Sequence, residues 1–148
     1  MISYQNSLQI LNKGRIKVKN ENILTNKSLN RVSSSNIYSK FNYPAGNNAA
    51  FDGYAINSND TKKLNRQKSK AFKIIGSVSA GNKPFKKRIK KFEAVEIMTG
   101  GIIPKGFNTI IPIESINFLP NKKSRKFIMI DKKIKKYDHV RFAGSDYK

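Results

Sequence analysis

Three short stretches of the chain place glycine beside a polar side chain and apolar neighbours, a combination that can do chemistry. They read AAFDGYA at residues 49–55, EIMTGGIIPKG at 96–106 and VRFAGSDYK at 140–148. Glycine lets the backbone approach a ligand closely and adopt a positive φ. A hydroxyl or carboxylate beside it can then face that ligand, or a cation bound with it. We therefore interpret the three stretches as candidate parts of a ligand site.

The polar side chains in these stretches suit a metal ion and an anion. Asp52 and Asp146 could hold a hard divalent ion such as Mg²⁺ through oxygen ligands. The hydroxyl of Thr99 and the amides of the two glycines after it could bind a phosphate or another oxyanion. Arg141 could steady a carboxylate or bind phosphate.

Each of these residues also has a plainer interpretation. An Asp-Gly pair is first a turn signal, so Asp52 could simply cap a bend, and Thr99 could begin an ordinary hairpin turn. Asp146 and Arg141 could both be solvated. His139, the only histidine, fits a surface or loop residue, because no Ser or Cys partner pattern surrounds it.

The composition indicates a soluble protein without disulfides. The chain has 148 residues, enough for one domain, or one small domain and part of a second. It contains no Cys, which excludes a thiolate metal site. No apolar run approaches the roughly 20 residues that span a bilayer, and the N-terminus does not read as a signal peptide. We expect a cytoplasmic protein with no membrane partner.

The chain is strongly basic, with 30 Lys and Arg against 9 Asp and Glu and a net charge of +21. Such a charge can indicate nucleic-acid binding. The basic runs, however, lie beside turn-like residues or alternate with apolar ones, as on solvated strand edges and loops. The joint abundance of Lys, Asn and Ile is also what the codons of an AT-rich genome produce. We expect only weak, salt-sensitive contact with nucleic acid and no specific nucleic-acid partner.

Helix is predicted in the N-terminal third. Residues 3–13 read as an amphipathic helix that Ser3 caps and Gly14 ends. Its apolar positions fall on one face at helical spacing: Tyr4, Leu8 and Leu11.

Two weaker elements are predicted after this helix. Residues 15–19 alternate between basic and apolar side chains and favour a brief strand. A second helix is expected to begin at Thr25, with Leu29 and Val32 on its buried side.

The rest of the chain reads as β structure. Residues 71–81 are rich in Ile and Val, and 91–98 alternate between apolar and charged side chains. Residues 107–116 form another apolar run, in which Pro112 favours an edge strand or a bulge. Residues 126–136 are expected to form one arm of a hairpin, and the tail reads as a loop.

The order and spacing of the three stretches resemble the N-terminal part of the molybdopterin molybdotransferase family, the MoeA type to which the gephyrin E domain belongs. Residues 44–55 read PAGNNAAFDGYA, where the family has P-x-x-D-N-S-A-M-D-G-Y-A. Residues 94–114 read AVEIMTGGIIPKGFNTIIPIE, where the family has A-V-R-I-M-T-G-A-x-x-P-x-G-A-D-A-V-V-x-x-E. Residues 139–146 read HVRFAGSD, where the family has N-V-R-x-x-G-E-D. The resemblance covers nearly the whole chain.

The resemblance implies an enzyme of molybdenum cofactor biosynthesis that inserts molybdate into adenylylated molybdopterin with Mg²⁺ taking part. It assigns catalytic roles to Asp52, Thr99 and Asp146, and the two carboxylates would also hold the metal. The cofactor-binding positions that it implies are Gly53, Tyr54, Gly100, Gly101 and Arg141.

The resemblance also implies the fold and the assembly. We expect a β-rich α+β fold of twisted, bifurcated sheets, irregular and elongated, with one or two short N-terminal helices. Residues 1–45 would form a helical and extended segment and 46–148 a linker-type β domain. In this family a following α/β domain completes the active site across a homodimer. The chain would then carry one half of each site and need that domain in cis or in trans.

Several polar positions of the family pattern have changed in this chain. Glu96 stands where the family has Arg, which reverses a charge next to the motif. The other changes replace polar or acidic residues, or Met, with different side chains: Asn47, Ala49, Phe51 and Ser145. Three functions therefore stay open: part of a molybdotransferase, a noncatalytic interaction or dimerisation module derived from that family, and a basic nucleic-acid-binding protein.

Overall fold

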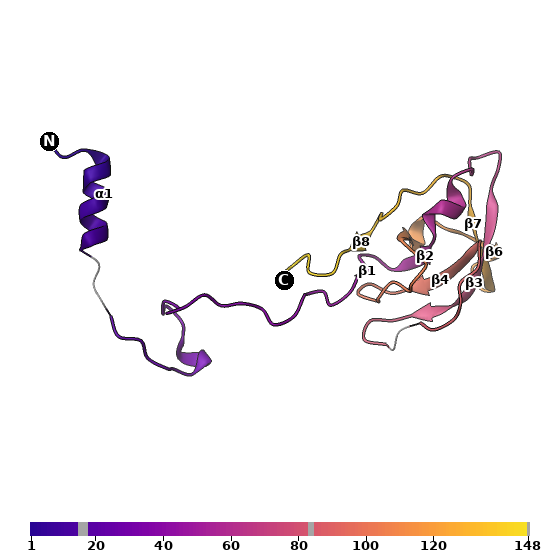
Figure 1. Cartoon of the computed structure of the whole chain (residues 1–148). Coiled ribbons are helices and arrows are strands. Elements are labelled where there is room, and N and C mark those ends of the chain that lie inside the picture. The colour runs from indigo at the N-terminus through magenta and orange to yellow at the C-terminus, as the bar shows by residue number, and fades with distance from the viewer. Residues whose placement is uncertain (15–17, 83–84, 148) are drawn as a thin grey trace. The chain divides into compact units, whose positions relative to one another are not determined.

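The computed structural model describes residues 1–14, 18–82 and 85–147. The chain divides into two compact units, Met1–Tyr38 and Ser39–Lys148. The first unit carries the helix and the second carries all the strands (Figure 1). The boundary that we expected after residue 45 lies inside the second unit.

The predicted N-terminal helix is present as α1, Tyr4–Lys13. The Ser3 hydroxyl accepts a hydrogen bond from the Asn6 N–H at 3.3 Å, and the Gly14 N–H donates to the Ile10 carbonyl. Both predicted caps are therefore confirmed, because each satisfies a backbone group that the helix end leaves free. The apolar face of α1 is exposed.

The second predicted helix is wrong. Only a single 3₁₀ turn forms, η1, Thr25–Lys27. Asn30 adopts a φ of 62°. A right-handed helix cannot continue through this residue, because helical residues have a negative φ. Leu29 and Val32, expected on a buried side, are exposed. The strand expected at 15–19 lies largely outside the described residues, and residues 18 and 19 are not in a strand.

The second unit is built on a six-stranded sheet in the order β5-β2-β4-β3-β7-β6. Neighbours are antiparallel except for β3 and β4, which run parallel. The strands are β2 (Gly53–Ile56), β3 (Lys70–Val78), β4 (Glu93–Ile97), β5 (Thr109–Pro112), β6 (Asn117–Pro120) and β7 (Arg125–Ile130). Short 3₁₀ turns follow β2 and β5: η2 (Ser58–Thr61) and η3 (Ile113–Ser115).

This sheet confirms the β predictions. Strands β3 and β4 occupy the two predicted segments. Pro112 lies on β5, an edge strand, as its missing N–H requires. Strand β7 pairs with β6 in an antiparallel hairpin, so residues 126–130 form the predicted arm.

A second, two-stranded sheet joins distant parts of the chain. β1 (Asn48–Ala49) pairs antiparallel with β8 (Val140–Arg141). The tail that we read as loop therefore contributes this short strand. The pairing brings the first candidate stretch against the third.

The large sheet curls on itself. The ring of Tyr54 on β2 meets the ring of Phe118 on β6 edge-to-face, with centroids 5.7 Å apart. Three strands separate β2 from β6 in the sheet order, so only a strongly curved sheet brings these rings together. Twisted sheets curve in this way because each strand is rotated relative to its neighbour.

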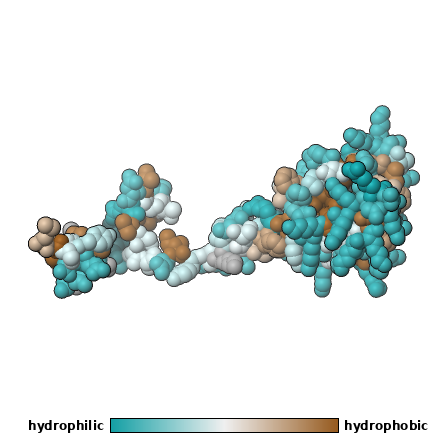
Figure 2. Space-filling view, turned by 90° about the horizontal axis from the view of Figure 1, so that it is seen from above, coloured by the Kyte–Doolittle hydropathy of each residue, from teal (hydrophilic) through white to brown (hydrophobic). Residues whose placement is uncertain are grey.

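The core lies on both faces of the sheet. Tyr54 and Ile56 pack into one buried cluster, and Ala55 between them packs into the other. On β4, Ala94 and Val95 divide between the same two clusters. Successive side chains of a strand point to opposite faces, so β2 and β4 are covered on both sides. The visible outer face of this unit is mostly hydrophilic (Figure 2). In the described ranges no helix has the length and apolar character of a membrane span.

Candidate functional site

The three candidate stretches meet through main-chain hydrogen bonds. The Ala49 N–H donates to the Gly101 carbonyl at 3.0 Å, and the Gly100 N–H donates to the Ala49 carbonyl at 2.9 Å. The Ala50 N–H donates to the His139 carbonyl at 2.9 Å. Together with the pairing of β1 and β8, these bonds fix the first stretch between the other two.

Asp52 and Thr99 form the central side-chain contact of this junction. The backbone N–H and the hydroxyl of Thr99 both donate to Oδ1 of Asp52, each over 2.7 Å. These bonds lower the pKa of Asp52; the backbone bond contributes most and the hydroxyl bond next. Asp52 is exposed, and its Oδ2 has no hydrogen-bond partner within the described ranges. The result is an ionised, oriented carboxylate with one oxygen available.

Two glycines place this pair. Gly53 follows Asp52 where β2 runs closest to β5, and a Cβ built on it would lie 2.0 Å from the Ile111 carbonyl oxygen. Gly100 follows Thr99 with a φ of 78°, in the region that favours glycine. Its turn is closed by the Gly101 N–H, which donates to the Met98 carbonyl at 2.8 Å. The N–H groups of Gly100 and Gly101 thus both donate inside the chain, and neither is available to an anion in this structure.

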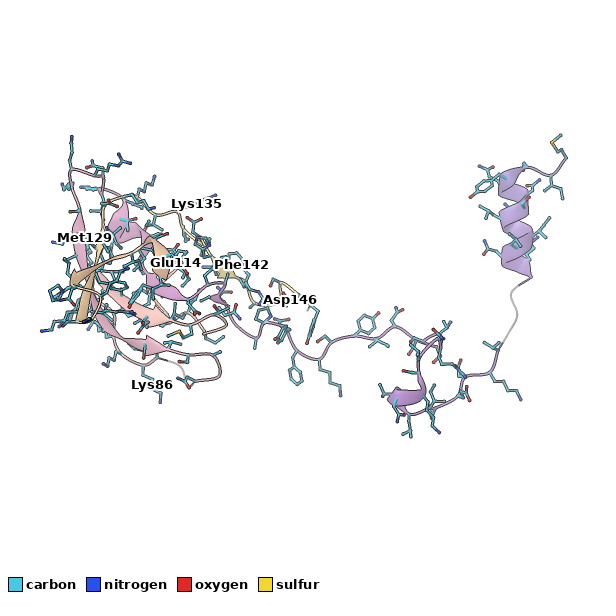
Figure 3. All side chains as sticks on the ribbon, turned by 180° about the vertical axis from the view of Figure 1, so that it is seen from behind. Lys86, Glu114, Met129, Lys135, Phe142 and Asp146 are labelled. Carbon is cyan, nitrogen blue, oxygen red and sulfur yellow. The ribbon has the colours of Figure 1, made fainter. Side chains whose placement is uncertain are left out.

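Arg141 and Asp146 form a second, separate pair. Nη2 of Arg141 lies 2.7 Å from Oδ2 and 3.0 Å from Oδ1 of Asp146, and the Ser145 hydroxyl donates to Oδ1 at 3.1 Å. The hydrogen bond from Arg141, and then that from Ser145, lower the pKa of Asp146. Asp146 lies on the C-terminal segment (Figure 3). Its N–H donates to the Tyr43 carbonyl at 3.0 Å, which fixes the pair to the chain just before β1.

Tyr54 lies in the core, away from the exposed carboxylate beside it. Its side chain is fully buried, and its hydroxyl donates to Oε1 of Glu96 at 3.3 Å. Burial is the main reason that the pKa of Tyr54 is raised, with the Glu96 charge next. A bound molecule has no access to this side chain.

The charge reversal at Glu96 is matched within the fold. Nη1 of Arg125 on β7 lies 3.5 Å from Oε1 of Glu96, and the Arg125 guanidinium also lies over the Phe118 ring, 4.8 Å from its centroid. The carboxylate therefore faces a cation and the hydroxyl of Tyr54. The Glu96 side chain therefore links strands of the sheet.

The two proposed metal ligands do not form a metal centre by themselves. The described ranges contain no group of three or more His, Cys, Asp or Glu side chains that could hold a metal ion. Both carboxylate oxygens of Asp146 face Arg141, so only Oδ2 of Asp52 is available as a ligand. Mg²⁺ is commonly held by one or two carboxylates together with substrate phosphates and water. For that role Asp52 presents an oxygen without a hydrogen-bond partner among the residues that the structure describes, whereas both oxygens of Asp146 accept hydrogen bonds from Arg141.

Two asparagines that the motif reading did not assign to the site support this junction. Oδ1 of Asn47 accepts from the Ala143 N–H at 3.0 Å, a bond that an aspartate here would make equally well. Asn48 is 7% exposed, and its Oδ1 is the buried side-chain atom without a hydrogen-bond partner in the described part of the chain. An Asn-Asn pair at the end of an extended segment was the available signal. The partner of Asn47 lies 96 residues further on, so only the fold identifies it.

Phe51 and His139 border the junction. Their rings meet edge-to-face at 5.0 Å, and both residues are exposed. His139 also has a φ of 56°. The expectation that it is a surface loop residue is confirmed.

Comparison with known proteins identifies the family. Residues 2–148 match the family model described as MoeA N-terminal region (domain I and II). The chain is 28% identical over 147 residues to a molybdopterin molybdenumtransferase of Staphylococcus epidermidis, covering 99% of this chain and 34% of that protein. It is 31% identical over 120 residues to the Bacillus subtilis protein of the same name, covering 80% and 27%. The structure superposes on that of the molybdopterin biosynthesis moeA protein of Pyrococcus horikoshii with a TM-score of 0.80 and 26% identity, over 100% of this chain and 38% of the other. The chain therefore spans about a third of the length of these relatives.

Proposed function

The chain belongs to the family of the MoeA N-terminal region, and from that premise we propose that it is part of a molybdopterin molybdenumtransferase. In this proposal it serves the insertion of molybdate into adenylylated molybdopterin during molybdenum cofactor biosynthesis. The observation that carries the proposal is the Asp52–Thr99 pair, which leaves one carboxylate oxygen exposed on a rigid junction.

The roles of the site residues follow from their contacts. Asp52 is the catalytic carboxylate, and Thr99 is a positioning residue, because both of its donors are directed at Asp52. A carboxylate held ionised and fixed can act on a bound cation or a transferring group without first reorganising. The pair of Arg141 and Asp146 shapes the adjoining backbone, and Gly53 and Gly100 allow the close main-chain approach.

Magnesium in this proposal binds mainly to the phosphate groups of the substrate, with Oδ2 of Asp52 as a protein ligand. When bound, it would neutralise part of the charge on those phosphates. The part of the chain described here supplies one such ligand, and the others come from substrate, water or another domain.

The proposed site is completed by protein outside these 148 residues. The relatives are about three times longer than the matched region, since the chain covers 34% of the Staphylococcus epidermidis protein. We propose that an α/β domain, in cis or in trans, closes the site across a homodimer. The reaction would take place in the cytoplasm on a small-molecule substrate.

A molybdate-insertion assay tests the proposal. The 148-residue chain alone is expected to show no turnover, and an α/β portion of a relative added in trans restores it. Asp52→Asn then lowers the restored rate about a hundredfold, and Thr99→Val about tenfold, through the lost charge-assisted hydrogen bond. Asp131→Asn, an exposed carboxylate outside the junction, is the matched control.

Two results would contradict the proposal. Robust turnover by the chain alone would show that the site is not divided. If neither Asp52→Asn nor Thr99→Val changed the restored rate, the chain would instead have the second function, that of a noncatalytic interaction module.

A further inference from the structure

A surface hollow outside the carboxylate junction is lined by seven residues, six of which carry a side-chain hydrogen-bond donor. It lies between the turn η2 and the lysine-rich segment 131–137. Its lining residues are Ser58, Asn59, Lys62, Lys133, Lys135 and Lys136, with Ile134 between the lysines. Lys135 is at the surface of the β unit (Figure 3).

Two fully buried threonines hold the lysine segment in place. The hydroxyl of Thr61 accepts from the Ile134 N–H at 2.9 Å and donates to the Ser58 carbonyl at 2.8 Å. The hydroxyl of Thr109 donates to the Lys135 carbonyl at 2.9 Å. Ile134 packs against the core. The backbone on both sides of the hollow is thus fixed before any ligand arrives, which reduces the entropy that binding must overcome.

The lysines around the hollow are not neutralised by the chain. Lys62, Lys133 and Lys135 make no ion pair among the described residues, and Lys136 lies over the Tyr137 ring, 4.5 Å from its centroid. Three carboxylates lie close in sequence, and one of them, Asp131, is exposed at the start of the lysine-rich segment. Asp60 accepts from the Phe92 N–H at 3.0 Å. Asp138 lines a neighbouring hollow that shares Lys133, Ile134 and Lys135 with this one.

Ser58 adds an unused polar group to this charge. It is only 6% exposed, and its hydroxyl makes no hydrogen bond to any residue that the structure describes, although it lines the hollow. The hydroxyl is not among the enclosed side-chain atoms that lack a partner, so it is open to the hollow, where water or a ligand can satisfy it. Its position among lysines without an ion-pair partner in the described ranges indicates an anion with several acceptor oxygens.

The lining contains four lysines, and lysine commonly binds phosphate as a point charge. The lining also lacks an aromatic ring on which a nucleotide base could stack. We propose that this lysine hollow binds a small anion with two or more linked phosphate groups. This inference does not rest on the proposed function, because none of its residues belongs to the carboxylate junction.

Calorimetric titration with pyrophosphate and with tripolyphosphate, at roughly 0.15 M salt, tests this inference. We expect saturable one-to-one binding that weakens about tenfold in Lys62→Gln/Lys133→Gln/Lys135→Gln, which removes three charge-assisted contacts. The matched control Lys122→Gln/Lys123→Gln/Lys126→Gln removes the same charge from the β6–β7 hairpin and should change affinity less than about twofold. Ser58→Ala tests the hydroxyl without changing charge and should weaken binding about threefold.

Three results would overturn the inference. Wild-type protein that shows no saturable binding has no such site. Equal losses in the two triple variants would mean that the overall charge of the chain attracts phosphate. If a 12-nucleotide single-stranded DNA bound more tightly than either phosphate probe, and that binding were lost only in Lys62→Gln/Lys133→Gln/Lys135→Gln, the hollow would be a nucleic-acid site. Circular dichroism of each variant checks that it is folded.

Discussion

Thr99 directs both of its donors at a single oxygen of Asp52, although the two residues are 47 positions apart in the sequence. The backbone donor would remain after any substitution of the side chain except by proline. The hydroxyl donor can be removed alone. A substitution at Thr99 therefore weakens the hydrogen bonding that orients Asp52 while the carboxylate itself is retained.

Thr99→Val should raise the pKa of Asp52 part of the way towards its ordinary value. The larger, backbone contribution to the lowered pKa stays and the hydroxyl contribution is lost. A pH titration of the Asp52 carboxyl carbon by NMR measures the change. Thr25→Val, in the first unit, should leave the Asp52 titration as it is in the wild type; an unchanged pKa in Thr99→Val would show that the hydroxyl bond does not form in solution.

The ion pair of Arg141 and Asp146 should make stability depend on pH in the acid range. The pKa of Asp146 is lowered in the folded chain, so its contribution is complete above the unfolded value of about 3.9 and is lost as the pH falls through the folded value. The free-energy difference between wild type and Asp146→Asn should therefore be largest near neutral pH and vanish in acid. Urea unfolding across this range measures it, with Asp131→Asn as the control. A difference that grows towards acid pH would be the wrong sign for this pair.

Gly53→Ala should lower the free energy of unfolding by about 2–4 kcal/mol. The added methyl group would lie 2.0 Å from the Ile111 carbonyl oxygen, and this contact is with backbone that cannot turn away. Gly46→Ala is the control in the same unit, since its nearest neighbour is the far end of the Ile102 side chain at 3.3 Å. Chemical denaturation of both variants provides the comparison, and equal stabilities would contradict the close approach of β2 and β5.

The pair of Glu96 and Arg125 should be weakly coupled. Their side chains are 28% and 41% exposed, so a double-mutant cycle with Glu96→Gln and Arg125→Gln should give about 0.5–1 kcal/mol. Glu96→Arg restores the residue of the family pattern but places two cations together, and should destabilise the fold by a similar amount. Glu114→Gln, an exposed position on η3, is the control. If Glu96→Arg stabilised the fold instead, the ion pair with Arg125 would not explain why this chain has Glu where the family pattern has Arg.

Local pattern was enough to predict β3, β4, β5 and β7, but neither the remaining strands nor the neighbours of any strand. The Ile- and Val-rich run at β3 and the Pro on β5 carry their own signals, and both predictions hold. The order of the six strands depends on pairings between segments far apart in the sequence. That Arg125 would compensate Glu96 follows only from this order and from the curl of the sheet.

Tyr54 shows why the candidate site could be predicted only in part. It adjoins Asp52 and Gly53 in the motif, and proximity in sequence suggested a shared role. Successive residues of a strand face opposite ways, so Tyr54 enters the core. Because β2 is buried on both faces, its apolar pattern gave no indication of which side chain points where.

The junction of the three stretches is held largely by bonds between backbone groups, from Ala49 to Gly101 and from Ala50 to His139. Such bonds depend little on which side chain each position carries. Substitutions at positions 49 and 51 can therefore leave the geometry of the junction unchanged. The geometry of this site is therefore set by the course of the main chain, together with Asp52, Thr99 and the glycines that allow its close approach.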